Sequence, residues 1–125
     1  MNDLIGLRYA WGHRPSDGSG FTDCFHLSCE IRKRLGLIDH SSLYSWVYEQ
    51  YTEATFSARQ LARFLLTSGT RTTSPSTGNM VLVEAASGAL GTVTDYGMVY
   101  IGATGYVIHR PGITTTAYYF DMDQL

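Results

Sequence analysis

The feature that most constrains the fold is a change of hydrophobic pattern in the middle of the chain. In the first half, apolar residues recur at helical spacing, as at Leu27, Ile31 and Leu35. From residue 80 onward, short runs rich in β-branched and aromatic residues are typical of strands. The segment between, TSGTRTTSPSTGN (67–79), has no apolar periodicity and predicts a loop between two halves of one domain. Helices followed by an antiparallel sheet define the α+β class.

The predicted elements are set by local signals. The expected helices are residues 24–35, 39–51 and 55–69. The first has Thr22 or Asp23 as its N-cap, and Gly36 ends it. The expected strands are residues 80–85, 96–102, 105–110 and 114–120. A tight hairpin, GATG, joins the second and third strands. A length of 125 residues fits a single domain, 1–125.

Charge and hydropathy argue against two classes of partner. The net charge is −2 and the pI is about 6.0, so the chain lacks the basic stripe of a nucleic-acid-binding protein. The longest apolar-leaning run, Met98–Ile108, is interrupted by glycine and is far shorter than the ~20 residues that span a bilayer. We therefore expect neither nucleic acid nor membrane as a partner. The first residues, MNDLIGLRYAWG, also lack the pattern of a secretory signal.

The two cysteines do not form a metal or disulfide pattern. Cys24 and Cys29 lie five residues apart, which turns them about 140° from each other on one helix. A mutual disulfide is therefore not expected. The spacing of cysteines and histidines does not match a structural zinc site, so we expect no metal and no cofactor.

Cys24 stands at the predicted start of a helix, directly after a Gly-rich turn in GSGFTDCFHL. Unpaired backbone N–H groups and the helix dipole favour a thiolate there, and this makes Cys24 a candidate nucleophile. A structural cysteine in the core would occupy the same helix face, since free cysteine is among the most buried residue types. Position alone leaves both interpretations open.

A nucleophilic thiol needs a base, and the chain offers four histidines. They are His13, His26, His40 and His109. His13 lies in a Gly-rich loop, His26 on the polar face of the Cys24 helix and His40 in a turn. His109 ends the strand GYVIH in the half of the chain that forms the sheet, and it is the strongest candidate. A strand-end histidine that faces solvent is the competing interpretation.

Three segments resemble the NlpC/P60 cysteine peptidases. YAWGHRPSDGSGFTDCFHL is similar to the family's nucleophile segment, Tyr-x-(Tyr/Trp)-Gly-Gly followed by Gly-(Phe/Ile)-Asp-Cys-Ser. STGNMVLV is similar to its Pro-Gly-Asp-Leu-Val-Leu strand, and DYGMVYIGATGYVIHRPG to its His-Val-Gly-Ile-Tyr-Ile-Gly…Phe-Ile-His-Ala hairpin. The three motifs occur in the family's order, from Tyr9 to about Phe120.

The resemblance implies a papain-like domain whose N-terminal helices pack on a C-terminal antiparallel sheet. It also implies hydrolysis of peptide bonds in bacterial peptidoglycan through an acyl-enzyme, with the stem peptide as partner. Cys24 would be the nucleophile and Asp23 the structural acid beside it. Tyr9 would be the tyrosine whose hydroxyl lies near the thiol and the substrate, and His109 the polar residue that orients the base. Tyr96 and His13 are further candidates for substrate binding.

The chain departs from the family at the general base, where Asp95 or Tyr96 stands in place of histidine. Three alternatives are open. His109 could act as base with Asp95 orienting it, giving a set of Cys24, His109 and Asp95 with exchanged roles. His13 or His26 could supply the base locally. In the third alternative the domain is catalytically inactive.

The expected function is therefore a peptidoglycan peptide hydrolase, an endopeptidase or amidase. The alternative is an inactive NlpC/P60-like component with a structural or wall-docking role, for instance in a phage tail tip beside other virion proteins. Without a secretory signal, the localisation expected is a virion or delivery to the cell wall.

Overall fold

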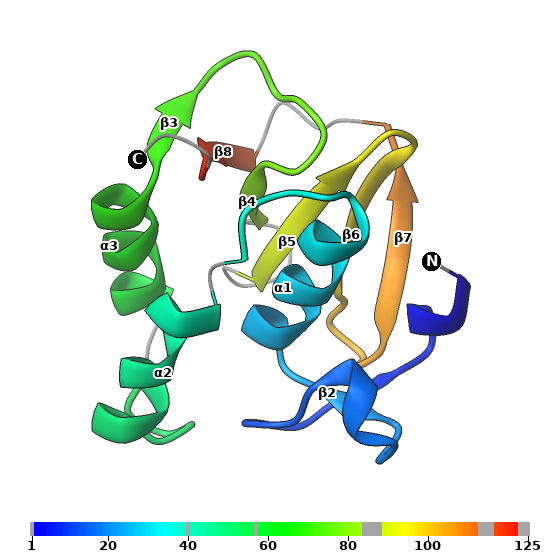
Figure 1. Cartoon of the computed structure of the whole chain (residues 1–125), viewed down its shortest axis with the longest axis vertical. Coiled ribbons are helices and arrows are strands. Elements are labelled where there is room, and N and C mark those ends of the chain that lie inside the picture. Colours follow the sequence, from blue (N-terminus) through cyan, green and yellow to red (C-terminus); the bar gives the residue numbers. More distant parts are fainter. Residues whose placement is uncertain (1, 40, 57, 84–88, 113–116, 123–125) are drawn as a thin grey trace.

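The computed structural model describes residues 2–39, 41–56, 58–83, 89–112 and 117–122. These residues form three α-helices and a six-stranded antiparallel sheet, which confirms the α+β class (Figure 1). The helices are α1 (Cys24–Arg34), α2 (Ser41–Gln50) and α3 (Ala58–Ser68), with 3₁₀ turns η1 (Asn2–Leu4) and η2 (Pro15–Asp17). The sheet strands are β3 (Thr70–Thr72), β4 (Met80–Val83), β5 (Ala89–Thr94), β6 (Gly97–Ile101), β7 (Val107–Pro111) and β8 (Ala117–Asp121). Their order in the sheet is β3-β8-β4-β5-β6-β7.

Helix α1 packs on the middle of the sheet, over β5 and β6 (Figure 1). Its N-cap is Asp23, whose side chain accepts the backbone N–H of His26. Leu27 and Ile31 lie one turn apart on the buried face, as the helical spacing predicts. The capping and the apolar stripe together confirm the predicted start and direction of this helix.

The sheet buries side chains on both of its faces. Along β6, Val99 contacts the α1 side, whereas Met98 and Tyr100 belong to a second apolar cluster on the other face. The same alternation occurs in β4, where Met80 and Val81 belong to different clusters. The central strands therefore bury side chains on both faces of the sheet, and their sequences are apolar almost throughout.

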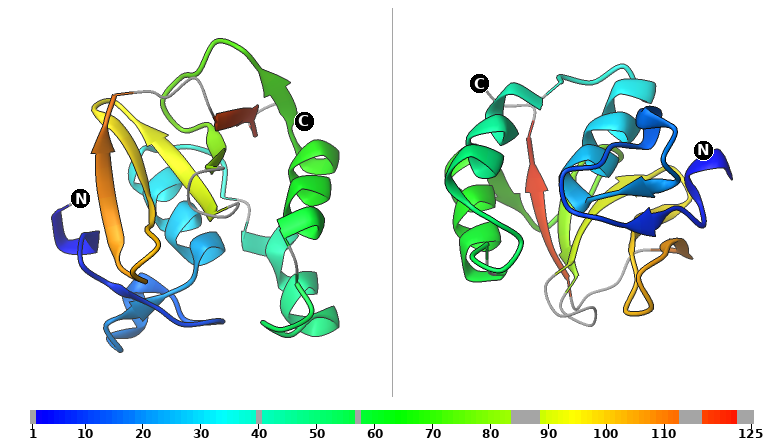
Figure 2. Two further views of the ribbon diagram at one scale, coloured as in Figure 1. Left: turned by 180° about the vertical axis from the view of Figure 1, so that it is seen from behind. Right: turned by 90° about the horizontal axis from the view of Figure 1, so that it is seen from below.

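Helices α2 and α3 stand together beside the sheet at its β3 edge (Figures 1 and 2). Their inward residues join one cluster with Phe25 of α1. Its other buried members are Val47, Leu61, Phe64, Leu65, Met80, Leu90, Phe120 and Met122. This cluster fixes α2 against the start of α1, which is the arrangement that builds the candidate site.

Two strands of the sheet are missing from the sequence prediction. Segment 89–94 had no predicted structure, but it forms β5 and pairs with both β4 and β6. Segment 70–72, assigned to a loop, forms the edge strand β3 against β8. The four predicted strands correspond to β4, β6, β7 and β8, and β6 and β7 form the expected hairpin. Residues 84, 85 and 114–116 of those predictions lie outside the described residues.

A buried hydrogen bond ties α1 to β5. The Thr92 hydroxyl donates to Ser28 Oγ at 2.8 Å, and both residues are almost fully buried. We expect Ser28→Ala to lower the free energy of unfolding by about 1–2 kcal/mol, because it leaves the Thr92 hydroxyl without its acceptor. The double variant Ser28→Ala/Thr92→Val is expected to lose less than the sum of the two single changes. Urea unfolding of all four proteins checks this, and strictly additive changes would contradict it.

Candidate functional site

The N-terminal segment crosses the start of α1 and holds its first residues in place (Figure 2). Strands β1 (Arg8–Tyr9) and β2 (Phe21–Thr22) form a short parallel pair. Backbone bonds then connect the loop to the helix cap: the Asp23 N–H donates to the His13 carbonyl at 3.0 Å, and the Ala10 N–H donates to the Thr22 carbonyl. These bonds place residues 9–14 beside the cap of α1.

Cys24 is the first residue of α1, and its side chain is partly buried between two apolar clusters. Backbone N–H groups of Cys24, Phe25 and Leu90 favour its thiolate. Burial opposes them more strongly and, together with the Asp23 carboxylate, raises the pKa of the thiol to about 12. Burial of the sulfur thus opposes the effect of the helix start, which was expected to favour the thiolate.

The sheet strand that reaches the sulfur is β5, through the N–H of Leu90. Its sequence, ALGTVT, contains no histidine and no acidic or basic residue. Among the hydrogen bonds of the described residues, none joins a histidine to Cys24 Sγ. The cysteine at the nucleophile position of the resemblance thus makes no hydrogen bond to a histidine among the described residues, and His40 lies outside them.

The structure brings His109 and Asp95 together, but not with Cys24. Both line a pocket of about 290 Å³ that is also lined by Leu35, the residue after the last turn of α1. Cys24 begins the same helix, and at 1.5 Å per residue the two ends are about 16 Å apart. The predicted set of Cys24, His109 and Asp95 is therefore divided between opposite ends of α1.

Within that pocket, Asp95 does not orient the imidazole. Its carboxylate accepts a hydrogen bond from the Thr77 hydroxyl at 2.6 Å, and His109 is exposed on β7 with no side-chain hydrogen bond to another described residue. Tyr96 is 80% exposed at the rim. These three residues form a surface pocket rather than a proton relay to a thiol.

The other two predicted substrate-binding residues lie near the start of α1. Burial, followed by the charge of Glu53, raises the pKa of Tyr9. The His13 ring is exposed, and its Nδ1 is 3.0 Å from a carboxylate oxygen of Asp17. Tyr9 lies in β1, which pairs with Thr22 of β2 just before the start of α1, and the His13 ring bonds within its own loop.

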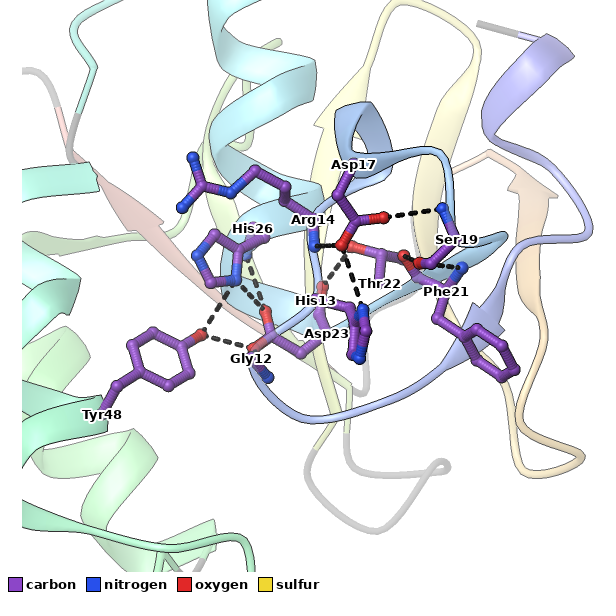
Figure 3. A network of polar contacts seen from close by, with 10 residues as sticks. All are labelled: Gly12, His13, Arg14, Asp17, Ser19, Phe21, Thr22, Asp23, His26 and Tyr48. Carbon is purple, nitrogen blue, oxygen red and sulfur yellow. Dashed lines mark hydrogen bonds and ion pairs between the residues drawn. The ribbon is translucent and has the colours of Figure 1, made fainter.

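The most connected polar group at this end of the molecule is the Asp23 carboxylate, which is only 1% exposed (Figure 3). It accepts four hydrogen bonds from three segments of the chain. The donors are the Gly12 N–H at 2.9 Å, the His26 N–H at 2.9 Å, His26 Nδ1 at 2.9 Å and the Tyr48 hydroxyl at 2.5 Å. Burial alone would raise the pKa of Asp23, but the bonds from His26 and Tyr48 outweigh it and lower the pKa. The carboxylate is ionised at neutral pH.

His26 and Tyr48 are the residues of this network that sequence reasoning missed. His26 was assigned to a polar face, but its ring stacks on Tyr48 of α2, with centroids 5.0 Å apart. The spacing of Asp23 and His26, three residues apart at a helix start, was the available signal, because such pairs share a helix face. Tyr48 left no comparable signal, since its contact depends on how α2 packs on α1.

The part of the chain that the structure describes offers no cluster of metal ligands: no group of three or more His, Cys, Asp or Glu side chains there is arranged to hold a metal ion. None of the helices in that part has the length and apolar character needed to cross a membrane.

Comparisons with known proteins add no relative. No family model, no curated protein and no solved structure matches the chain.

Proposed function

We propose that this protein is a catalytically inactive, papain-like NlpC/P60 domain that docks on peptidoglycan stem peptides without cleaving them. The observation that carries the proposal is the environment of Cys24. Burial and the Asp23 carboxylate raise the pKa of the thiol, and the strand that reaches its sulfur has no base. A protonated thiol without a base cannot attack a peptide carbonyl at a useful rate.

The strand order supports the family part of the proposal. In the family pattern, the base histidine begins the strand that comes after the Leu-Val-Leu strand. Here β4, with the sequence MVLV, is succeeded by β5, which begins at Ala89 and pairs with β4 in antiparallel register. With this register, the segment ALG would align with His-Val-Gly in place of DYG, the segment that the sequence comparison aligned there, and alanine would stand at the position of the family's histidine. Asp95 and Tyr96 then lie in the turn between β5 and β6.

The experiment is a sedimentation assay with insoluble peptidoglycan. We expect the protein to co-sediment with purified cell-wall sacculi, to release no soluble peptides or amino groups, and to behave identically as Cys24→Ala. Failure of the wild-type protein to co-sediment would refute wall docking. The Cys24→Ala variant keeps the fold, because alanine leaves the apolar contacts of the position with only a small loss of volume.

A peptidoglycan hydrolase that uses Cys24 is the second candidate. It is favoured by the cysteine at the first turn of α1, with the N–H groups of Cys24 and Phe25 close to its sulfur and Tyr9 nearby. The same sacculi distinguish the two functions. Peptide release by the wild-type protein that Cys24→Ala abolishes would establish hydrolysis and refute the inactive domain.

A further inference from the structure

A second pocket opens on the side of α1 away from Cys24. It has a volume of about 660 Å³ and lies between the loop at Trp11–Arg14, the first turn of α1 and helix α2. His26 contributes from α1, two residues after Cys24 and therefore about 200° around the helix. The pocket is thus separate from the cysteine, and a ligand bound in it would be independent of the proposed function.

The network around Asp23 fixes which nitrogen of His26 is available. Because the Asp23 carboxylate is ionised and can only accept, Nδ1 must carry a hydrogen and donate to it at 2.9 Å. The ring is held further by stacking on Tyr48. Only Nε2 remains for a ligand, and the ring itself is a wall of the pocket (Figure 3).

Arg14 supplies the permanent positive charge of this pocket. Figure 3 shows its guanidinium extending from the loop to the side where His26 and Tyr48 lie. The guanidinium makes no hydrogen bond or ion pair with another described residue, and the pocket lining includes no aspartate or glutamate. Five N–H donors in a planar fork are therefore free to pair with an anion, and a carboxylate is the anion that this fork pairs with bidentately.

The remaining walls suit the organic part of such a ligand. Trp11 and Tyr48 lie side by side, with ring centroids 5.0 Å apart and planes tilted by 56°. Ser41 and Ser45 of α2 add hydroxyl groups at the opposite wall. Flat aromatic surface beside a guanidinium favours a carboxylate attached to an apolar group over a fully hydrated inorganic ion.

We propose that this pocket binds an organic carboxylate, with Arg14 pairing to its oxygens and the His26 ring lining the pocket beside it. The nearby carboxylates are bonded to other groups. Asp23 accepts hydrogen bonds from Gly12, His26 and Tyr48, and Glu30, one turn further along α1, bonds to Arg34.

The test is a titration of the ¹⁵N-labelled protein with N-acetylphenylalanine, monitored through amide chemical shifts. Its amide, N-acetylphenylalaninamide, is the matched uncharged ligand, and inorganic phosphate is the matched inorganic anion. We expect saturable shifts at Gly12, His26 and Ser45 with the carboxylate, and at least tenfold weaker binding of the amide. Arg14→Gln is expected to weaken carboxylate binding about tenfold, as loss of a charge-assisted pair does. Arg71→Gln, which removes the same charge from edge strand β3, should change nothing.

The contribution of the His26 ring is tested with His26→Asn. Asparagine keeps an N–H for Asp23 and removes the part of the ring that lines the pocket, so carboxylate binding is expected to weaken several-fold. Three results would overturn the proposal: shifts that do not saturate around the pocket, phosphate or the amide binding as well as the carboxylate, or equal effects of Arg14→Gln and Arg71→Gln.

Discussion

Iodoacetamide is expected to alkylate Cys24 of the folded protein at pH 8 at least about fiftyfold more slowly than the same cysteine in the unfolded chain. Burial, with the Asp23 carboxylate, raises the pKa of this thiol to about 12. At pH 8 its thiolate fraction is then on the order of one in ten thousand, against roughly a quarter for an ordinary thiol. A thiolate with a higher pKa is also more nucleophilic, here by about fortyfold, and this offsets part of the loss in reaction rate. The rate that remains is the roughly fiftyfold slower alkylation stated above. Restricted access to the partly buried sulfur slows the reaction further.

The measurement is the rate of labelling, determined by mass spectrometry of the peptides that contain each cysteine. Cys29 is an internal comparison, because burial raises the pKa of its thiol to about 12 as well. Cys24→Ala isolates the Cys29 signal, and denaturant provides the unfolded reference. Rapid labelling of Cys24 in the folded protein, with a midpoint near or below pH 7, would indicate an activated thiolate and would contradict the inactive domain.

The sequence was sufficient for the parts of the fold that are set by local signals. The N-cap Asp23 and the apolar spacing of Leu27 and Ile31 are properties of the helix itself, and the structure confirms both. The hairpin of β6 and β7 was also predictable, because a glycine-containing turn separates two runs with strand character. Each of these features needs only neighbours along the chain.

Strand β5 could not be predicted because it lies in the middle of the sheet. Its residues contact α1 on one face, through Leu90 and Thr92, and the second apolar cluster on the other, through Val93. A strand covered on both faces does not alternate between polar and apolar residues, and ALGTVT also contains a glycine. Missing this strand had a consequence for the site. It left the next strand, with Asp95 and Tyr96 at its start, as the apparent neighbour of Cys24.

The sequence predicted only those parts of the candidate site that local signals determine. The sequence placed Cys24 at the start of α1 and Asp23 beside it, since both positions are determined by the cap. It could not show that Tyr48 of α2 bonds to Asp23, or that His109 faces the far end of α1. Both facts depend on the packing of elements that are distant in sequence.

Asp23→Ala is expected to lower the free energy of unfolding at pH 7 by about 3–5 kcal/mol. The change removes the N-cap of α1, worth about 1 kcal/mol, and leaves two partly buried donors, on the loop and on α2, unpaired at roughly 1–2 kcal/mol each, the lower part of the usual range. The Gly12 N–H and the Tyr48 hydroxyl are the two that lose their acceptor outside the helix. Asp23→Asn keeps one oxygen acceptor, so we expect it to lose roughly half as much. Urea unfolding at pH 7 measures both changes.

The pH dependence of the same unfolding reaction identifies the ionised Asp23 carboxylate as the source of this stability. The pKa of Asp23 is lower in the folded than in the unfolded protein, so this carboxyl group binds fewer protons when the protein is folded. Its contribution to stability is complete above the unfolded value of about 3.9 and is lost as the pH falls through the folded value. The difference in free energy of unfolding between the wild-type protein and Asp23→Asn should therefore narrow below about pH 4.

Asp17→Ala is the control for Asp23→Ala, because Asp17 also accepts loop N–H groups but is exposed to solvent. If Asp23→Ala were no more destabilising than Asp17→Ala, the Asp23 network would not be what joins the loop, α1 and α2.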